Sequence, residues 1–434
     1  MGAMSHVLLD RGHRVSGCDA TGSAPYDLLR RGVRCAAGHS ADHVLGTDFV
    51  FVSSAAIRGP VATEIRAARD SGIRVLSRSD LFGEWSSERP TLAIAGTHGK
   101  TTTTAMAVTV MRSAGMRPSY VVPAGGPVSG LPVNGAWGGN PFVAEADEYA
   151  RTFLGFFPHA AIITSVDWDH RETYPTPDSE WDAYVEFARK SRCVFACSDN
   201  PGSAGVAERL RGQVGISTYG RSEGSDWLVS DVAAAGLGSS FSVSHGGDRA
   251  KVRLEVPGVH NVLNAAAAIA SAVEFGVGFR ESAEAVRAYR GAYRRFEVRM
   301  RKGGIVLVDD YAHNPGKVRA TVAAARAAFP GNRLVCFFGP QHYRRTTEQA
   351  EGFAGALSGC DLVFVGGSCS TREDRPDHDP AAALAEKMGV SYLPDVPSAA
   401  KAVRAAIREG DVVITVGAQE MCRAVSDCLQ ESLG

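Results

Sequence analysis

The sequence predicts an α/β protein built from three units in series. Short apolar runs that end in Gly, Ser or Asp alternate with longer Ala/Arg-rich segments of helical period, the pattern of strand–helix–strand units. The length of 434 residues exceeds what one ordinary hydrophobic core holds. The composition, 44% hydrophobic and 21% charged, is typical of a folded globular protein.

The first unit runs from the N-terminus to a polar stretch. We expect strands at Arg14–Cys18 and Asp48–Ser53 and a helix at Val61–Ser71. The segment Gly83–Pro90 (GEWSSERP) is polar and ends in proline, which favours a linker between two units. The sequence therefore predicts a domain boundary close to residue 88.

The second and third units continue the alternation. After residues 181–189 the second unit becomes β-rich and then closes in an Ala-rich helix. Its expected strands are Leu92–Ala95, Phe142–Glu145, Ala160–Val166, Ser240–Val243 and Lys251–Val256, and the helix is Asn261–Phe275. From about Arg294 a third α/β cycle begins, with buried-strand candidates at Ile305–Asp309, Leu334–Phe338, Leu362–Val365 and Val412–Val416.

Charge, hydropathy and cysteine usage exclude several classes of protein. The formal net charge of −1 leaves no electrostatic footprint for nucleic acid or an anionic membrane. No apolar run approaches the roughly 18 residues of a membrane-spanning helix, and the N-terminus, with Asp10, Arg11 and Arg14, lacks the pattern of a signal peptide. The nine cysteines include no C-x-x-C pair, which favours free thiols in a reducing cytoplasm over a zinc site.

The strongest local signal is Leu92–Thr102 (LAIAGTHGKTT), in which an apolar strand runs into a glycine turn and then a helix. Glycines let backbone N–H groups curl round a phosphate, and the helix N-terminus adds partial positive charge. Lys100 would span the terminal phosphates of a nucleotide, and the Thr101 hydroxyl would hold Mg²⁺. The loop departs from a full Walker A pattern, because Ile94 stands where the first glycine belongs. A chance glycine turn before Lys-Thr is the alternative interpretation.

Two acidic clusters follow neighbouring predicted strands. Glu145–Glu148 (EADE) comes directly after one strand, and Asp167–His170 (DWDH) comes after the next. Both therefore lie at the carboxyl ends of strands, the edge where open α/β sheets bind ligands. Oxygen ligands at this edge suit a Mg²⁺ ion that bridges phosphates, whereas each carboxylate taken alone is as compatible with a solvated loop or a helix cap.

With these motifs in place, the chain resembles the Mur ligases. GTHGKTTTT, EADEY, the Asp169-His170 pair, PGVHNVLNAAAAIA, RRFE and DDYAHNP occur in the order seen in that family, and SGCD, Gly38-His39 and SSAAI extend the resemblance into the first unit. The resemblance implies three α/β domains. They are a Rossmann-like N-terminal domain of the UDP-substrate type at 1–88 with its first strand missing, a central ATP-binding P-loop domain at 89–293, and a Rossmann-like amino-acid-binding domain at 294–434.

The resemblance also implies an activity. It implies a ligase that activates a carboxylate as an acyl phosphate and joins it to an amino acid or amine, with ATP and Mg²⁺ as cofactors. His98 in the loop makes the chain most similar to the branch of the family that uses UDP-N-acetylmuramate and L-alanine in cytoplasmic peptidoglycan synthesis. We therefore expect small-molecule partners, neither nucleic acid nor membrane, and a monomer or homodimer.

Residue roles carry over position by position. The implied nucleotide-binding residues are Gly96, Thr97, His98, Gly99, Lys100, Thr101, Thr102, His260, Asn261, Asn264, Arg295 and Asp310. The implied metal ligands are Thr101, Glu145 and His170, and the implied catalytic residues are Lys100, Glu145, His170 and His313. His313 is either a base for the incoming amine or a hydrogen-bonded turn histidine. The implied substrate-binding residues are Asp19, His39, Ser53, His342 and Arg345.

Departures from the family pattern fall on the substrate sites. The family segment P-H-R-Y-S-R-T reads PQHYRRT at Pro340–Thr346, so His342 replaces an arginine while Arg345 is retained. Further differences are H-N-P for H-H-P at His313, a replaced A-A-G-E segment around Gly366–Ser370, GAQE for G-A-G-D at 417–420, and no evident N-A-R at 133–137. They favour an altered substrate on retained ligase chemistry.

Three functions stay open at this point. The first is ligation of UDP-N-acetylmuramate to L-alanine, and the second is a repurposed ligase that joins another acid and amine in specialised metabolism. The third, from a different class, is a nucleotide-binding or nucleotide-hydrolysing regulatory protein without ligase activity. Retention of Lys100, Thr101, Glu145 and His170 favours a ligase, because a protein freed from phosphoryl transfer needs no such set.

Overall fold

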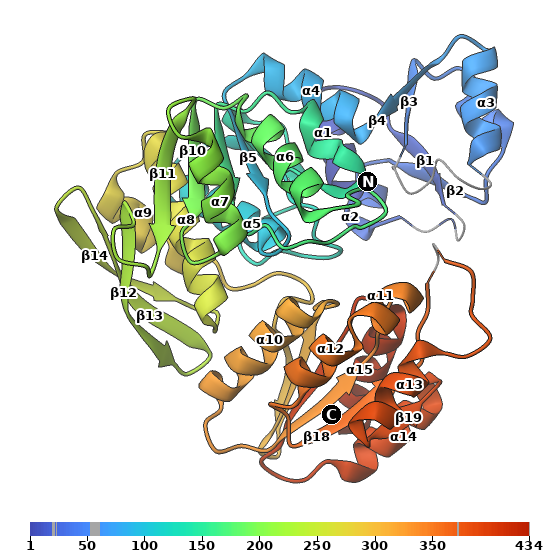
Figure 1. The fold of residues 1–434 in the computed structure, drawn as a ribbon. Helices are drawn as coiled ribbons and strands as arrows, with labels where there is room; N and C mark the ends of the chain where they lie inside the picture. Colours follow the sequence, from blue (N-terminus) through green and yellow to red (C-terminus); the bar gives the residue numbers. More distant parts are fainter. Residues whose placement is uncertain (20–21, 23, 53–60, 371–372, 434) are drawn as a thin grey trace. The chain divides into compact units, whose positions relative to one another are not determined.

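The computed structural model describes residues 1–19, 22, 24–52, 61–370 and 373–433 (Figure 1). They form two compact units. The first comprises Met1–Asp231, Phe241–Val252 and Leu263–Tyr289, and the second comprises Val232–Ser240, Arg253–Val262 and Arg290–Gly434. Among the residues described, no helix combines the length and the apolarity needed to cross a membrane.

The N-terminal part of the first unit contains two pairs of parallel strands. β1 (Ser16–Asp19) pairs with β2 (Arg34–Ala37), and β3 (Phe49–Val52) pairs with β4 (Arg74–Ser77). The helices of this part are α1 (Gly2–Asp10), α2 (Tyr26–Arg30), the 3-10 helix η1 (Ala41–Val44), α3 (Ala62–Asp70) and α4 (Arg78–Glu88). Figure 1 shows α3 beside β3 and β4. The predicted strands at 14–18 and 48–53 and the helix at 61–71 therefore exist with shifted ends, and Ser53 lies outside the described residues.

The predicted linker at Gly83–Pro90 is wrong, because most of it belongs to α4. Ser77 and Asp80 form a capping box that begins the helix, with reciprocal bonds of 3.2 and 2.7 Å. Trp85 is completely buried against Phe142 and other aromatic rings. The polar residues that suggested a linker lie on a helix whose other side chains enter the core.

The helix α1, which the sequence analysis did not predict, packs against the short strand β7 (Gly135–Ala136). A Cβ at Gly135 would lie 1.9 Å from the Ala3 carbonyl oxygen, so the two backbones touch. Trp137 N–H donates to an Asp10 carboxylate oxygen at 2.9 Å. Met4 and Trp85 belong to the same buried cluster as the strands around Phe142. The N-terminal part and the central sheet therefore share one hydrophobic core.

The central sheet has ten strands in the order β14-β13-β12-β11-β10-β9-β5-β8-β6-β7. The strands are β5 (Thr91–Ala95), β6 (Pro118–Val121), β7, β8 (Gly139–Glu145), β9 (Ala160–Ile163), β10 (Cys193–Cys197), β11 (Gly215–Gly220), β12 (Trp227–Ala235), β13 (Gly238–His245) and β14 (Asp248–Leu254). β5 lies between β8 and β9 and is parallel to both. The loops that follow β5, β8 and β9 therefore meet at the same edge of the sheet.

Helices cover this central sheet. They are α5 (Lys100–Ser113), η3 (Tyr149–Gly155), α6 (Pro177–Ala188), α7 (Pro201–Leu210), α8 (Val259–Glu274), α9 (Phe279–Ala285) and η4 (Val286–Ala288). α5 is buried along nearly its whole length, from Thr101 to Met111. A helix that is buried all round needs no polar face, which explains the run of threonine, alanine and valine that follows Lys100.

The C-terminal part of the second unit is built on a six-stranded sheet of order β15-β16-β20-β17-β18-β19. Its strands are β15 (Glu297–Lys302), β16 (Ile305–Asp310), β17 (Leu334–Phe338), β18 (Leu362–Gly366), β19 (Ser391–Leu393) and β20 (Val412–Val416). β15 is antiparallel to β16, and the remaining pairs are parallel. The four strands predicted in this region are confirmed.

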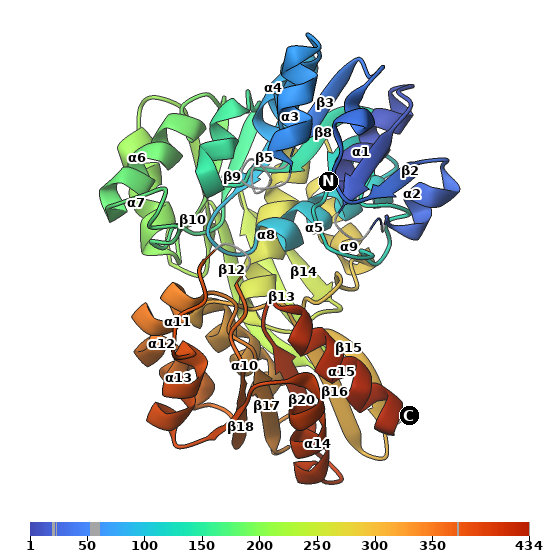
Figure 2. The same ribbon diagram turned by 90° about the vertical axis from the view of Figure 1, so that its right-hand side faces the viewer.

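Helices cover both faces of this sheet (Figure 2). They are α10 (Pro315–Ala328), α11 (Tyr343–Glu348), α12 (Ala350–Leu357), α13 (Pro380–Met388), α14 (Val396–Ala406) and α15 (Glu420–Leu433). Cys336 and Phe338 of β17 belong to the core on one face, and Val335 and Phe337 to the core on the other. Successive side chains of β17 thus point to opposite faces, and both faces are apolar. A strand that is apolar at every position is typical of a parallel sheet covered by helices on both sides.

Two adjacent phenylalanines test the shared core of the first unit. Phe156 is completely buried and stacks on Phe82 with ring centroids 4.7 Å apart. We expect Phe156→Ala to lower the free energy of unfolding by about 3–5 kcal/mol, because the core loses a buried ring and gains a cavity. Phe157 is 56% exposed, so Phe157→Ala should cost less than about 1 kcal/mol. Equal denaturation midpoints for the two variants would contradict this account.

Candidate phosphate loop and surrounding site

The glycine loop connects β5 to α5, and its shape requires both glycines. Gly96 has a φ of +136° and Gly99 a φ of +79°, conformations that other L-residues rarely adopt. A Cβ at Gly96 would lie 2.0 Å from Thr164 Oγ1, and a Cβ at Gly99 would lie 2.6 Å from Asn264 Oδ1. The loop is therefore held between the end of β9 and the helix α8 with no room for a side chain.

Ser165, just after β9, fixes the loop backbone. Its carbonyl oxygen accepts Thr97 N–H at 2.9 Å, and its hydroxyl oxygen accepts His98 N–H at 2.9 Å. These bonds explain why the predicted strand Ala160–Val166 ends at Ile163, since the following polar residues serve the loop. The first N–H groups of α5, at Lys100–Thr102, have no earlier carbonyl within the helix and form the anion-binding end.

Lys100 begins α5 and lies among carboxylates. Its Nζ donates to the two oxygens of Glu148 at 2.8 and 2.7 Å and to the Gly96 carbonyl at 2.7 Å. The Glu148 side chain is 1% exposed. Burial by itself lowers the pKa of Lys100, but the charges of Glu148, Asp147 and Glu145 outweigh it and raise that pKa above its ordinary value. Lys100 is therefore a fixed positive charge at the loop.

The predicted metal ligands lie beside this ion pair. Thr101 Oγ1 donates to Glu145 Oε2 at 2.7 Å. His170 has a left-handed φ of +49°, and its Nε2 lies 3.9 Å from Glu148 Oε1. A hydroxyl and a carboxylate that meet next to an anion-binding helix end are donors that suit Mg²⁺. The structure thus brings Lys100 and His170 to Glu148, and Thr101 to Glu145.

His98, within the loop, pairs with a residue that the sequence analysis had quoted without a role. Its Nε2 lies 2.8 Å from Asp167 Oδ2. The hydrogen bond from His98 holds the pKa of Asp167 below its ordinary value. Thr97 adds a second tie to the same residue, because its hydroxyl donates to the Asp167 carbonyl at 3.1 Å. The loop after β9 and the glycine loop are therefore joined at Asp167.

Glu180 on α6 lies beneath the site and was missed by sequence reasoning. It is completely buried, and its Oε2 accepts Asp169 N–H at 3.2 Å, next to His170. Burial raises the pKa of Glu180 to about 8, so the carboxyl group carries a proton at neutral pH. A signal was present in the sequence, since Glu180 shares a helix face with the buried Tyr184 and Phe187.

Tyr174 supports the same region from below. It is completely buried, and its hydroxyl donates to the Glu148 carbonyl at 2.6 Å. Burial, followed by the charges of Glu148 and Glu180, raises the pKa of Tyr174, so the hydroxyl stays protonated and remains a donor. Nothing in the local sequence indicated this contact, because Tyr174 and Glu148 lie on separate loops.

The candidate residues of α8 fall into two groups. The Asn264 side chain packs against Gly99 of the glycine loop. Asn261 instead serves the turn before the helix, where its Nδ2 donates to the Pro257 carbonyl at 2.7 Å. The ring of His260 lies over Gly258, where a Cβ would come within 2.6 Å of it. Contact of His260 and Asn261 with a nucleotide stays a prediction.

Arg295, Asp310 and His313 lie in the second unit. Asp310 is buried and accepts Phe296 N–H at 2.7 Å and Ala312 N–H at 2.8 Å, and burial raises its pKa. The guanidinium of Arg295 lies over the Tyr311 ring at 5.2 Å. His313 Nδ1 lies 3.0 Å from the Tyr311 carbonyl. A carbonyl can only accept, so Nδ1 carries the proton, and the lone pair of the neutral ring is on Nε2. These placements leave the roles of all three residues as predictions.

Arg294, the first residue of RRFE, was not predicted as important. It is 4% exposed and has a φ of +53°. Its Nε donates to Asp309 Oδ2 at 2.9 Å, and a terminal nitrogen donates to the Gly417 carbonyl at 2.6 Å. Thr415 Oγ1 also donates to Asp309 at 2.8 Å. The motif therefore joins three chain segments at the carboxyl end of β16 and β20.

The predicted amino-acid residues follow β17, at the same carboxyl edge of this parallel part of the sheet. His342 caps α11 and places Nδ1 3.2 Å from Ser370 Oγ, and Arg345 is half-buried on α11. Gln419 Nε2 donates to the carbonyls of Pro340 at 2.5 Å and Gly367 at 2.9 Å. The loops after β17, β18 and β20, which carry the departures from the family pattern, are thereby bonded to one another.

The predicted substrate-binding residues of the N-terminal part differ in their surroundings. Asp19 is exposed at the end of β1, and its carbonyl accepts Gly38 N–H at 2.8 Å. His39 follows β2 and places Nδ1 3.1 Å from Glu64 Oε2 on α3. Ser53 lies outside the described residues. Substrate binding by these three residues stays a prediction.

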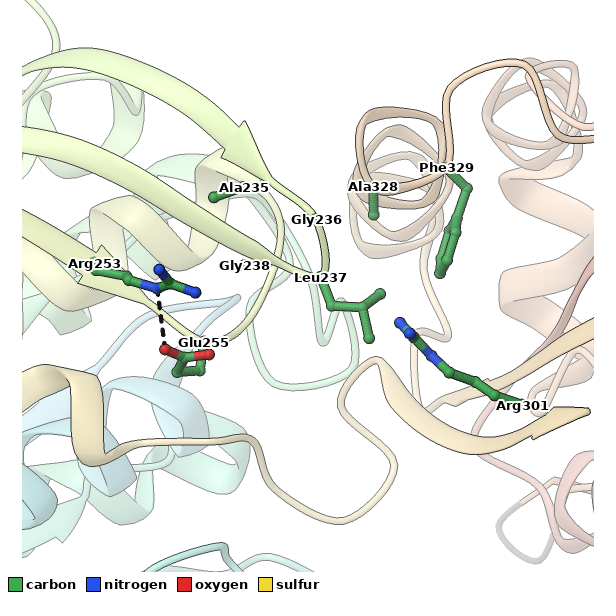
Figure 3. Close-up of a pocket in the computed structure, with 9 residues that line it drawn as sticks. All are labelled: Ala235, Gly236, Leu237, Gly238, Arg253, Glu255, Arg301, Ala328 and Phe329. Carbon is green, nitrogen blue, oxygen red and sulfur yellow. Dashed lines mark hydrogen bonds and ion pairs between the residues drawn. The ribbon is translucent and has the colours of Figure 1, made fainter.

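A separate pocket lies within the second unit (Figure 3). The hairpin tip 235–238 and Arg253 line one side, and Arg301, Ala328 and Phe329 line the other. Its volume is about 420 Å³, and Arg253 is paired with Glu255 at 3.2 Å. None of the predicted site residues lines it, so it has no part in the candidate site.

The pKa of Glu180 can be tested through the pH dependence of stability. Between the ordinary carboxyl pKa and about 8, the folded protein holds a proton that the unfolded chain has released, so the free energy of unfolding falls as pH rises. Glu180→Gln stays neutral and lacks this fall. We therefore expect the melting temperature of this variant, relative to the wild type, to increase between about pH 5 and about pH 8.5.

The exposed Glu186, paired with Arg151 on the surface, supplies the control for this measurement. Glu186→Gln should differ from the wild type by a nearly constant amount over the same range. Parallel stability profiles for Glu180→Gln and the wild type would show that Glu180 is ionised at neutral pH.

Comparison with known proteins connects this geometry to a family. Residues 1–89 match the catalytic domain of the Mur ligase family, 94–272 the Mur ligase middle domain, and 294–419 the Mur ligase glutamate ligase domain. The chain is 38% identical over 442 residues to the UDP-N-acetylmuramate–L-alanine ligase of Roseiflexus sp. (strain RS-1), an alignment that covers 96% of this chain and 94% of the relative. The enzyme of the same name from Kineococcus radiotolerans is 39% identical, with 97% and 91% covered.

Solved structures agree with the sequence relatives. The crystal structure of UDP-N-acetylmuramate–alanine ligase from Thermotoga maritima superimposes with a TM-score of 0.82 at 25% identity, covering 99% of this chain and 95% of the other. The fold of a murein peptide ligase from Psychrobacter arcticus matches with a TM-score of 0.71 at 22% identity and coverages of 100% and 96%. The resemblance inferred from the motifs and the α/β architecture that it implied are confirmed: this chain belongs to the Mur ligase family.

Proposed function

We propose that the chain joins the carboxylate of UDP-N-acetylmuramate to the amino group of L-alanine, with ATP as the phosphoryl donor. Members of the Mur ligase family are ATP-dependent ligases that form a carbon–nitrogen bond, and the relatives named for this reaction align with nearly the whole chain. The observation that carries the proposal is the buried pair of Lys100 and Glu148 at the glycine loop, beside the bonded pair of Thr101 and Glu145.

The charge at Lys100 explains how the loop would receive a nucleotide. A carboxylate and the terminal phosphate repel each other, so phosphoryl transfer between them needs positive charge at the point of approach. Lys100 supplies it, and Glu148 balances that charge in the absence of an anion. On nucleotide binding, Lys100 would exchange one Glu148 oxygen for a phosphate oxygen, while the first N–H groups of α5 bind the same phosphates.

The residues of the loop fit a magnesium ion. Thr101 Oγ1 and Glu145 Oε2, 2.7 Å apart, are hard oxygen donors next to the phosphate end, and His170 Nε2 lies 3.9 Å from Glu148 Oε1. When bound, Mg²⁺ would neutralise phosphate charge during transfer. We propose that Thr101 and Glu145 hold one ion and His170 a second. Their positions are set by α5, by the end of β8 and by the loop after β9.

The amine must lose a proton before it attacks an activated carboxylate. His313 has the required tautomer, because its bond to the Tyr311 carbonyl keeps the proton on Nδ1 and leaves Nε2 basic. We propose His313 as the residue that accepts this proton. Its alternative role, as a turn histidine bonded to the backbone, is compatible with the same contact.

A second candidate function keeps the ligase chemistry and changes the substrates. His342 stands where the family has an arginine, and it bonds to Ser370, another residue of a replaced segment. Gln419 likewise holds two substrate-side loops together. These contacts favour a different amine or acid, as in specialised metabolism. A regulatory protein without ligase activity has no comparable support, since the relatives are named as ligases.

We further propose that the protein works in the cytoplasm, where ATP and a nucleotide-linked sugar are available, on small molecules alone. Magnesium is expected as the metal. A monomer or homodimer remains the predicted assembly.

Lys100→Ala tests the phosphoryl-transfer step. We expect amine-dependent release of ADP from ATP, UDP-N-acetylmuramate and L-alanine to fall by about 10³-fold or more, because the developing charge loses its fixed cation. The matched control is Lys190→Ala, since Lys190 lies over the exposed Phe157 ring. A Lys100→Ala variant that keeps activity within tenfold of the wild type, with Lys190→Ala unchanged, would refute the role of Lys100 and the proposal built on it.

His342→Arg tests the amino-acid site. An arginine offers two parallel N–H donors to a carboxylate, so we expect the ratio of kcat/KM values for L-alanine and competing amino acids to change by about tenfold. The KM for ATP should stay within about twofold. His378→Arg makes the same substitution at an exposed position and should leave the ratio unchanged. An unaltered preference in His342→Arg would remove His342 from the amino-acid site.

A further inference from the structure

Four side chains with metal-binding atoms converge at the carboxyl ends of β1 and β2. Cys18 lies on β1, His39 follows β2, His43 lies on η1, and Glu64 is in the first turn of α3. Cys18 Sγ, His43 Nδ1 and a Glu64 oxygen all lie within 4.8 Å of one another. His39 Nδ1 joins them, at 3.4 Å from Cys18 Sγ and 3.1 Å from Glu64 Oε2. Three separate segments of the chain therefore present thiol, imidazole and carboxylate to one point.

Glu64 is the centre of this cluster. It is 4% exposed, and its Oε1 lies 3.0 Å from Cys18 Sγ and 2.9 Å from His43 Nδ1. Ser40 N–H approaches the same oxygen at 3.2 Å. A buried carboxylate needs compensating positive charge or hydrogen bonds. Here every approaching side-chain atom is one that also binds transition metals.

The donor set matches zinc. One sulfur, two imidazole nitrogens and one carboxylate oxygen are ligands of tetrahedral Zn²⁺ sites, whose bonds of about 2.0–2.3 Å place the donors roughly 3.3–3.6 Å apart. Cys18, His43 and Glu64 already have their ligand atoms within 4.8 Å of one another. His39 lies outside that group, with its Nδ1 3.4 Å from Cys18 Sγ and 3.1 Å from the other Glu64 oxygen, so its ring has to move toward the group to complete the set. A thiolate and a carboxylate also cancel the charge of a divalent ion. Magnesium, which prefers oxygen alone, does not suit this set.

We propose that Cys18, His39, His43 and Glu64 bind a structural zinc ion that ties β1, the segment after β2 and α3 together. Four protein ligands leave no open position, which is the pattern of structural sites. On binding, the Cys18 thiol releases its proton to solvent, each imidazole binds through Nδ1 with its proton on Nε2, and Glu64 binds as the carboxylate. Both histidine side chains are partly exposed, so Nε2–H can reach water.

This inference goes beyond the proposed ligase activity, and it assigns His39, which the resemblance implied as a substrate-binding residue, to the metal in place of the substrate. No C-x-x-C pair exists in the sequence, so the spacing of cysteines gave no zinc signal. The ligands come from positions 18, 43 and 64, with His39 beside them, and only the fold brings them together. The site is distinct from Thr101 and Glu145, which offer oxygen donors alone.

The test uses the full-length protein without a histidine tag, stripped of metal by a chelator and kept in excess Mg²⁺. Titration with ZnCl₂ should give one Zn²⁺ per chain with a Kd below about 1 μM and a rise in melting temperature. Substitution with Co²⁺ should give the visible absorption of a tetrahedral ion together with a near-ultraviolet thiolate-to-cobalt band. The band reports a sulfur ligand directly, which a purely stabilising effect would not produce.

Variants assign the ligands. Cys18→Ser should lose the thiolate band, and His43→Asn should weaken zinc binding by about tenfold or more. Cys35→Ser, on the neighbouring strand β2, should keep the band and the affinity of the wild type. Ligase turnover is measured in parallel but does not decide the question.

The wild-type spectrum settles the proposal even where a variant fails to fold. A wild-type cobalt complex without the thiolate band, or no zinc bound at micromolar concentration, would overturn the site. Loss of the band in Cys35→Ser and not in Cys18→Ser would do the same. In either case the four side chains form a hydrogen-bonded network around Glu64 and nothing more.

Discussion

The buried pairing of Lys100 with Glu148 is the constraint on which the rest of the candidate nucleotide site depends. Two charges in a protein interior lose their hydration, and removing one partner of such a pair typically costs about 3–5 kcal/mol. Glu148 therefore has to stay within reach of Lys100 until an anion of equal charge replaces it. The Tyr174 hydroxyl holds the Glu148 backbone in place. Because the Glu148 side chain is almost fully buried, water cannot replace Lys100 as the partner of its carboxylate.

Backbone strain gathers around the same residue. Ala150 and Arg151, two and three residues after Glu148, have left-handed φ values of 52° and 56°, and His170 has one of 49°. Such conformations cost on the order of 1–3 kcal/mol each in residues other than glycine, and they persist where surrounding structure determines them. Phe153, two residues after Arg151, is completely buried, and the buried Tyr174 bonds to the Glu148 carbonyl. In the loops after β5, β8 and β9, the non-glycine residues with left-handed φ are these three, all close in sequence to the charged cluster. Strain at that place is consistent with a site shaped for a ligand.

The loops after β17, β18 and β20, the proposed amino-acid site, are held together by hydrogen bonds. The replaced residues there are bonded to one another and do not leave gaps: His342 contacts Ser370, and Gln419 bridges Pro340 and Gly367. The loops thus keep a defined shape with a changed set of polar groups. If these loops hold the amine, as proposed, such changes would leave the fold and the phosphoryl chemistry in place, because neither depends on those side chains, and would alter the selectivity among amines.

The sequence alone determined the strand–helix alternation, the glycine loop with Lys100 and Thr101, and the family, because each depends on local pattern or on residue identity in a fixed order. It misjudged Gly83–Pro90, a polar stretch that contains the buried Trp85. For Glu180 it offered only a shared helix face, and it gave no signal for the hydrogen bonds that join Glu180 to Asp169 and Arg294 to Asp309. Only the tertiary structure decided those positions, as it decided the meeting of Cys18, His43 and Glu64. Burial, charge pairing and metal-ligand geometry are properties of groups brought together from distant segments, and no single segment carries them.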